Sequence, residues 1–174
     1  MKEAEKTMPI MGIVQPEIVP VDNTLRLRKF DGNYDIALPW YQDRETLLLV
    51  DGKEEPYTPA RIKGMYDYLN AHGELYWIEY RQEGTFVPIG DVTFWQEDMP
   101  IVIGEKMLRG KGIGRRVVVA LCRRARELGY RKIFVDEIYD FNTGSQRCFE
   151  RVGFVPYEKT ERGARYVLQL EEQV

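Results

Sequence analysis

Polar and apolar residues alternate in several short segments of the chain, a pattern typical of strands that bury one face. Residues 25–30 alternate in this way, and residues 74–96 read as two strands joined around Gly84. Short apolar runs predict further strands at 100–104 and 132–138, and a last strand at 164–170. The first strands follow one another directly, as in a meander, and the later ones alternate with helices.

Helical periodicity begins at the end of a glycine-rich turn and continues until Gly129. Thr58 and Pro59 are a typical start for another helix, which Gly73 ends, and residues 142–152 predict a third. These elements predict a mixed α/β fold with helices packed on a sheet. The apolar face of the long helix is expected at Ile113, Val117, Ala120, Leu121, Ala125 and Leu128.

The length of 174 residues fits one domain with a real hydrophobic core. We expect residues 1–22 to form a Pro-containing tail and residues 23–174 to form a single domain. Residues 33–50 read as irregular and partly helical, because Pro39 interrupts them. No apolar run is long enough to cross a bilayer, and the acidic N-terminus is a poor signal peptide, so we expect a cytoplasmic protein.

Few residues of the chain are suited to metal binding. Cys122 and Cys148 are the only cysteines, and both fall inside predicted helices, which favours buried free thiols. His72 is the only histidine, which leaves too little material for a His-based metal site or a serine triad. We therefore expect no metal.

Charge is unevenly distributed along the chain. The net charge is −3, yet residues 104–131 contain nine Lys or Arg against two Glu. A local cationic patch in an acidic chain argues for one anionic ligand rather than for a surface that coats nucleic acid. We expect neither a nucleic acid nor a membrane as partner.

Residues 109–114, with the sequence RGKGIG, join a predicted strand to the long helix. One interpretation is a tight connection that needs the backbone freedom of glycine. The other is an anion cradle, in which the chain approaches a phosphate closely and the helix start offers unpaired amides. The spacing fits neither a nucleoside-triphosphate loop, which needs Ser or Thr after the lysine, nor the dinucleotide-binding fingerprint.

The pattern R-x-x-G-x-G at 109–114, preceded by "PIVIG", resembles the coenzyme A pyrophosphate loop of GNAT N-acetyltransferases. The segment "DEIYDFNTGSQRCFERVGF" is similar to the last motif of that superfamily, with a strand, Asn142, a short helix and then Gly-Phe. The strong part of the resemblance covers residues 90–154. The segment "LRLRKF" together with Trp40 resembles the ribosomal-protein N-acetyltransferase branch.

The resemblance implies a GNAT fold, in which a mostly antiparallel central sheet is splayed between two strands and helices cover both faces. It implies acetyl-CoA as cofactor, with the pantetheine arm between segments 101–104 and 132–138. A backbone N–H near Ile103 or Gly104 would face the thioester carbonyl and stabilise the oxyanion. For Asn142 and Ser145, helix capping is an equal alternative to cofactor contact. The residues expected at the cofactor are Val102, Ile103, Gly104, Arg109, Gly110, Lys111, Gly112, Ile113, Gly114, Arg115, Asn142 and Ser145.

The resemblance places the general base at Glu137, for which a strand carboxylate that faces solvent or pairs with an arginine is an equal alternative. Asp98, ahead of the strand at 100–104, is the second candidate. Relatives often carry a tyrosine acid where this chain has Phe149, which we expect in the core. Ser145 or Tyr139 would then protonate the leaving thiolate, or the thiolate would leave without a strong acid.

These features predict an N-acetyltransferase that moves an acetyl group from acetyl-CoA to a primary amine by direct attack in a ternary complex. The acceptor is a small-molecule or peptide amine that the sequence does not identify. Phe94 and Trp95, next to Glu97, would suit a flat cationic amine, unless one of these aromatic residues is simply core. The alternative, which the absent tyrosine supports, is a non-catalytic acyl-CoA sensor or scaffold of the same fold. A homodimer is one open option.

Overall fold

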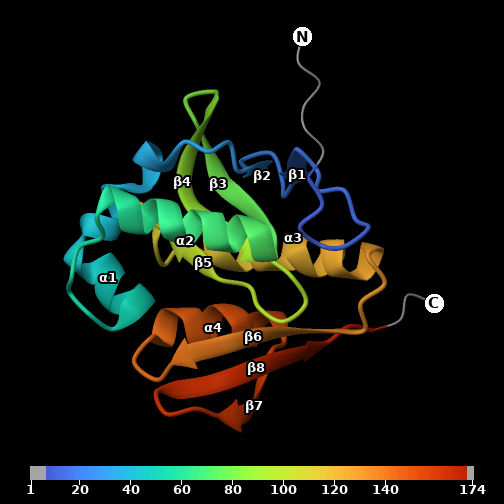
Figure 1. Cartoon of the computed structure of the whole chain (residues 1–174). Helices are drawn as coiled ribbons and strands as arrows, with labels where there is room; N and C mark the ends of the chain where they lie inside the picture. Colours follow the sequence, from blue (N-terminus) through green and yellow to red (C-terminus); the bar gives the residue numbers. More distant parts are fainter. Residues whose placement is uncertain (1–6, 172–174) are drawn as a thin grey trace.

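The computed structural model describes residues 7–171, and its strands form two antiparallel sheets (Figure 1). The first sheet has the order β1-β2-β3-β4-β5 and the second has the order β6-β8-β7. The strands of the first sheet are β1 (Ile18–Pro20), β2 (Leu25–Lys29), β3 (Glu74–Gln82), β4 (Thr85–Phe94) and β5 (Ile101–Ile103). Those of the second are β6 (Lys132–Tyr139), β7 (Val155–Lys159) and β8 (Gly163–Gln169). The sheet is therefore split between β5 and β6, as predicted.

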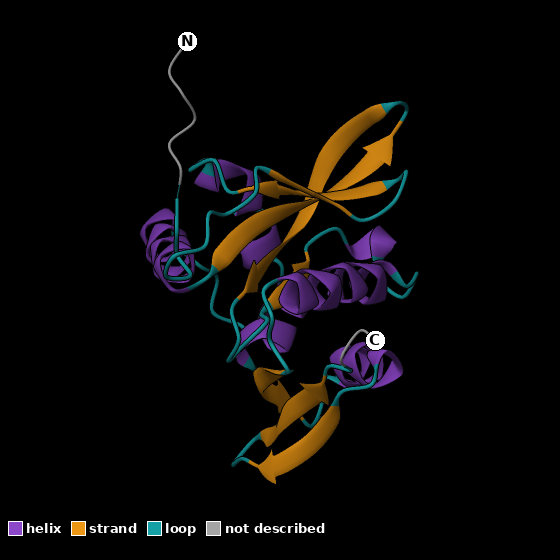
Figure 2. Ribbon diagram, turned by 90° about the vertical axis from the view of Figure 1, so that its right-hand side faces the viewer, coloured by secondary structure: helices purple, strands orange, loops and turns teal. Residues whose placement is uncertain are grey.

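Helices lie on both sides of the five-stranded sheet (Figure 2). On one side, α1 (Arg44–Asp51), α2 (Pro59–His72) and two short 3-10 helices enclose an aromatic core that includes Trp40, Tyr66 and Trp77. On the other side, α3 (Ile113–Glu127) and α4 (Thr143–Val152) pack against the sheets. The mixed α/β class and the helices on both faces are confirmed.

The helix α3 buries the face that its sequence predicts. Leu121 and Ala125 are fully buried, and Leu128, at the C-terminal end, is half-buried. Two arginines on its other faces fasten the helix to the first sheet. Arg116 donates to Asp22 over 2.8 Å, and Arg124 donates to both carboxylate oxygens of Glu74, at 2.9 and 2.7 Å.

The tail predicted for residues 1–22 is wrong for its second half. Gln15 is buried and donates its side-chain amide to the carbonyl of Leu75 over 3.0 Å. Three residues later β1 begins, and it pairs with β2 as an edge strand, the position in a sheet that tolerates Pro20. Residues 1–6 lie outside the described residues.

The strand β7 was not predicted, because all five of its residues are exposed and no alternation marks it. Its pairing with β8 also shifts register between Pro156 and Glu158. A strand held mainly by its neighbour carries little pattern of its own.

We predict that Arg124→Ala lowers the free energy of unfolding by about 3 kcal/mol, because it leaves the fully buried Glu74 carboxylate without its cation. Arg123→Ala, which removes an exposed arginine one position away, is the matched control and should change stability by less than about 0.5 kcal/mol. Urea unfolding measures both variants. Adding Glu74→Gln should restore part of the loss, and equal stability of the Arg124 and Arg123 variants would contradict this account.

Candidate active site

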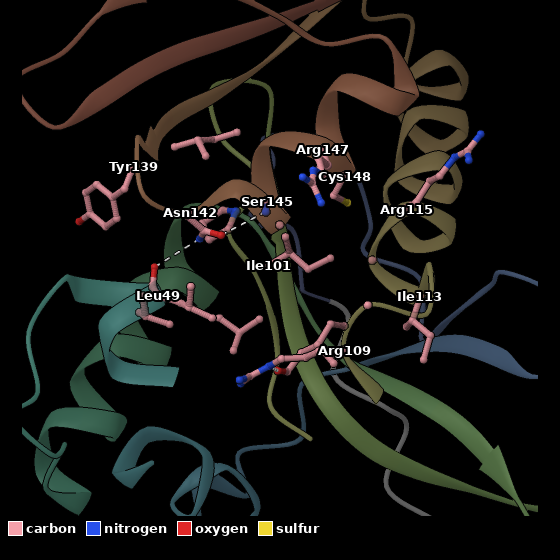
Figure 3. A pocket seen from close by; sticks show the side chains of 18 of the residues that line it. Leu49, Ile101, Arg109, Ile113, Arg115, Tyr139, Asn142, Ser145, Arg147 and Cys148 are labelled. Atoms are coloured by element: carbon pink, nitrogen blue, oxygen red, sulfur yellow. Dashed lines mark hydrogen bonds between the residues drawn. The ribbon is translucent and has the colours of Figure 1, made fainter. Parts of the chain in front are cut away.

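A cavity of about 770 Å³ opens where β5 and β6 separate (Figure 3). Its lining comes from α1, β5, the glycine turn, β6 and α4. All four predicted catalytic residues line it: Asp98, Glu137, Tyr139 and Ser145. Ten of the predicted cofactor residues also line it: Val102, Ile103, Arg109, Gly110, Gly112, Ile113, Gly114, Arg115, Asn142 and Ser145.

The glycine turn presents bare amides to this cavity. The first helical hydrogen bond of α3 joins the N–H of Arg116 to the carbonyl of Gly112, 3.2 Å away. Within residues 7–171, the amides of residues 110–115 have no hydrogen-bond acceptor. Gly110 and Gly112 have φ values of 72° and 79°, and a Cβ added at either would meet no atom within 4 Å. The turn is therefore an open cradle of donors at the positive end of a helix, which suits a diphosphate.

Alternate residues of β5 direct their backbone N–H and C=O groups towards the gap between β5 and β6. The N–H of Thr93 donates to the carbonyl of Pro100 over 3.0 Å, and the N–H of Gly104 donates to the carbonyl of Ile89 over 2.8 Å. Both bonds point to β4, so by alternation Ile101 and Ile103 direct their N–H groups away from it. The N–H of Ile103 thus faces the gap.

Gly104 was predicted to contact the cofactor, but it does not line the cavity. Its amide is used in the bond to β4, and the residue is buried against Trp40. A Cβ at this position would lie 2.2 Å from the indole ring, so glycine is required by close packing. Lys111 is exposed in the glycine turn and does not line the cavity.

The side chain of Arg109 lends two of its three guanidinium nitrogens to the fold, whereas its buried Nη1 has no hydrogen-bond partner among the described residues. Its Nε donates to the carbonyl of Ile103 over 2.8 Å, and its Nη2 donates to Oγ1 of Thr46 over 2.7 Å. The Thr46 hydroxyl in turn donates to Asp43, the N-cap of α1, over 3.0 Å. Arg109 therefore ties the glycine turn to both β5 and α1. The only signal for Thr46 in the sequence is its place three residues after a capping aspartate.

Asn142 caps α4 and also reaches α1. Its Oδ1 accepts the N–H of Ser145 over 3.1 Å, and its Nδ2 donates to the carbonyl of Leu49 over 3.5 Å, as the dashed lines in Figure 3 show. The capping interpretation is confirmed. Both residues still line the cavity, so contact with a ligand remains a prediction.

Asp98 lies where the two sheets begin to diverge. One carboxylate oxygen accepts the N–H of Met99 over 2.8 Å and the N–H of Asp136, in β6, over 3.0 Å. Burial raises the pKa of Asp98 to about 6, although these two amides act in the opposite direction. A carboxyl group with this pKa changes its charge close to neutral pH, as a general base requires.

Glu137 is exposed and lies in β6 where pairing with β8 shifts register, between Val135 and Ile138. A bulge of this kind turns a side chain towards a new direction, and here Glu137 lines the cavity. No arginine or lysine of the described residues is within ion-pair distance of it. Glu137 therefore remains a candidate base beside Asp98.

Aromatic residues near the cavity differ in their surroundings. Phe149 is 1% exposed and packs edge-to-face on Phe154, which confirms its place in the core. Phe94 is fully buried, as the core alternative predicted for one of the two aromatic residues, and neither it nor Trp95 lines the cavity. Tyr139, which was predicted only as an acid, stacks on Phe141 with ring centroids 5.2 Å apart.

Within residues 7–171, no group of three or more His, Cys, Asp or Glu side chains is arranged to hold a metal ion. No helix in the same part of the chain combines the length and the apolar composition that a membrane span needs.

The model of the acetyltransferase (GNAT) family matches residues 34–154. This chain belongs to the GNAT acetyltransferase family. A protein of Methanocaldococcus jannaschii is 26% identical over 178 residues, which cover 92% of this chain and 36% of that protein. The chain thus spans little more than a third of that relative.

Solved structures share the GNAT fold of this chain. A domain from Methanocaldococcus jannaschii matches with a TM-score of 0.76 and 23% identity, over 86% of this chain and 100% of that one. RimL, a ribosomal L7/L12 alpha-N-protein acetyltransferase crystallised with coenzyme A, matches with a TM-score of 0.69 and 17% identity, over 88% and 98%. The family and the fold predicted from the two motifs are confirmed.

We predict opposite effects for one substitution at two buried threonines. Thr46→Val removes the acceptor of the Arg109 guanidinium and should lower the free energy of unfolding by about 2 kcal/mol. Thr93 has a buried hydroxyl without a hydrogen-bond partner among the described residues. Thr93→Val should therefore raise the free energy of unfolding by about 1 kcal/mol. Urea unfolding of both variants checks the signs, and a Thr46 variant as stable as the parent would contradict the role of Arg109.

Proposed function

We propose that this GNAT protein transfers an acetyl group from acetyl-CoA to a primary amine, by direct attack within a ternary complex. The observation that carries the proposal is the run of bare amides at residues 110–115, which opens into the cavity beside the exposed edge of β5. Family membership and the coenzyme A complex of RimL support it.

The residues of the cavity fit coenzyme A at both of its polar parts. The amide cradle at 110–115 would hold the diphosphate, and the backbone groups of Ile101 would pair with a pantetheine amide. When bound, acetyl-CoA supplies the activated acetyl group. The N–H of Ile103 would then stabilise the negative charge that develops on the carbonyl oxygen during attack.

The acceptor amine must be neutral to attack, and a positioned carboxylate can remove its proton. We assign this role to Asp98, because it lines the cavity and its pKa of about 6 keeps it ionised but basic at neutral pH. The oxygen that accepts two backbone amides fixes the carboxylate, and its other oxygen remains to accept the proton. Glu137 is the second candidate.

The leaving thiolate needs no dedicated acid, because a thiol with a pKa near 8.5 leaves tolerably and takes its proton from water. Phe149 cannot donate a proton and lies in the core. Tyr139 and Ser145 both line the cavity and carry hydroxyl groups that can supply the proton instead.

Three carboxylates line the cavity, those of Asp98, Asp136 and Glu137. Their negative field favours a cationic acceptor, which fits a small-molecule or peptide amine. Incubation of the protein with acetyl-CoA and a panel of amines, followed by thiol detection and mass spectrometry, tests the activity. Tight binding of acetyl-CoA without release of coenzyme A for any amine would favour a sensor or scaffold instead.

We predict that kcat/KM falls about tenfold per pH unit below pH 6, because Asp98 must be deprotonated to act and loses its negative charge as the pH falls through its pKa of about 6. Deprotonation of the acceptor amine raises kcat/KM further as the pH increases, and this effect is the same in all variants. Asp98→Asn keeps an oxygen that can accept both amides but removes the base, so it should lower kcat/KM by about 100-fold or more.

Glu137→Gln is the matched control for that experiment. It replaces the second candidate base, which also lines the cavity, by its neutral amide, as Asp98→Asn does for the first. If Asp98 is the base, this variant keeps the break near pH 6 and most of the activity. The reverse pattern, with Asp98→Asn active and Glu137→Gln inactive, would move the role to Glu137.

A further inference from the structure

One end of the cavity is aromatic and apolar. Tyr139, the last residue of β6, lines the cavity there together with Leu49 and Val50 of α1. Figure 3 shows Tyr139 and Leu49 at this end, far from Arg115 in the first turn of α3. The glycine turn leads into α3, so the aromatic end is the one remote from the amide cradle.

Tyr139 belongs to a stacked pair of rings. Its ring lies on that of Phe141, with centroids 5.2 Å apart and an angle of 19° between the ring planes. Phe141 in turn rests against the C-terminal end of α1, because its ring is 3.5 Å from a Cβ built on Gly52. Phe141 is nevertheless 53% exposed, so the stack leaves aromatic surface open to a ligand. We call Tyr139 and Phe141 the aromatic pair.

The bulge in β6 turns Tyr139 to the same side of the strand as two carboxylates. Val135 and Ile138 are both buried in the core that includes α4. Asp136 and Glu137, which lie between them, are exposed. Tyr139 follows Ile138 and by alternation points away from that core, as the two acidic residues do. Carboxylates and aromatic rings therefore face the same space.

The spacing along β6 fits an amine that carries a ring close to its nitrogen. Asp98 accepts the N–H of Asp136 over 3.0 Å. Tyr139 lies three residues further along the strand, roughly 10 Å away. A nitrogen hydrogen-bonded to Asp98, two carbon atoms and a ring stacked on Tyr139 together span about the same distance, since stacked centroids lie about 5 Å apart.

We infer that the aromatic pair binds the acceptor, and that the acceptor is a primary amine with an aromatic ring two carbon atoms from its nitrogen. The inference rests on the proposed function, because it names the substrate class of that same site. Phenethylamines contain this unit, and so does a peptide with an aromatic residue at its amino terminus. An aromatic ring fits the pair better than an aliphatic group of equal size, because stacked rings attract each other beyond the effect of the area that they bury.

Acetylation of matched amine pairs tests this inference. One pair is phenethylamine and cyclohexylethylamine, which share a carbon skeleton and differ in aromaticity. The other pair is a peptide with phenylalanine at its amino terminus and the same peptide with cyclohexylalanine there. At equal concentrations of neutral amine, the parent should show a kcat/KM about fivefold higher for the aromatic member of at least one pair, mainly through a lower KM. The pair that shows the preference identifies the source of the acceptor.

Phe141→Leu removes the exposed ring and should bring the preference close to one, and Tyr139→Leu should do the same. Tyr139→Phe keeps the stack and loses only the hydroxyl group, so it should keep the preference whatever its effect on kcat. Tyr157→Leu is the control, because Tyr157 is 50% exposed in β7 and does not line the cavity, and it should keep the preference as well. Any difference in pKa between the two amines of a pair cancels when variants are compared.

Two kinds of result would overturn the inference. Equal kcat/KM of the parent for both members of each pair would show that no ring is recognised. A preference that Phe141→Leu and Tyr139→Leu leave unchanged, or an equal fall for both amines, would give the aromatic pair a structural role only. If other amines are acetylated and these are not, the inference alone fails. If no amine at all releases coenzyme A, the proposed function fails too.

Discussion

The unpaired edge of β5 is the constraint on which the site depends. Backbone groups at the edge of a strand must find partners or remain open to water and ligands. Here the carbonyl of Ile103 is satisfied by Arg109, and the N–H of the same residue stays directed to the gap. At the other end Asp98 accepts the N–H of Asp136 and holds the two sheets together where they diverge. The gap is thus fixed at both ends and open between them.

The helix α1 links the glycine turn to the start of α4. Thr46 accepts from Arg109 of the glycine turn, and the carbonyl of Leu49 accepts from Asn142 at the start of α4. The two contacts are one turn apart on the same short helix. Since α1 also supplies part of the cavity wall, it fixes the positions of both the glycine turn and the start of α4 relative to the cavity.

Much of this architecture could be predicted from local signals. The amphipathic face of α3 and the cap at Asn142 follow from neighbours in sequence, and both were confirmed. The partner of Arg109 could not be predicted, because Thr46 is 63 residues away and nothing near either residue indicates the contact. The raised pKa of Asp98 is also a consequence of long-range burial. Local patterns predict elements, whereas side-chain partners depend on how those elements assemble.

The arginines on and around α3 are close together in the sequence, but they differ in the groups that they contact. Arg116 meets Asp22, between β1 and β2, and Arg124 meets Glu74 of β3, whereas Arg109 meets a carbonyl and a hydroxyl. These cations are used by the fold, since each stabilises a contact between elements. Arg115 differs because it faces the cavity without an acidic partner, although it is adjacent in sequence to Arg116. On a helix, neighbours in sequence point about 100° apart, so one segment can fasten the core with one face and present a cation to the cavity with the next.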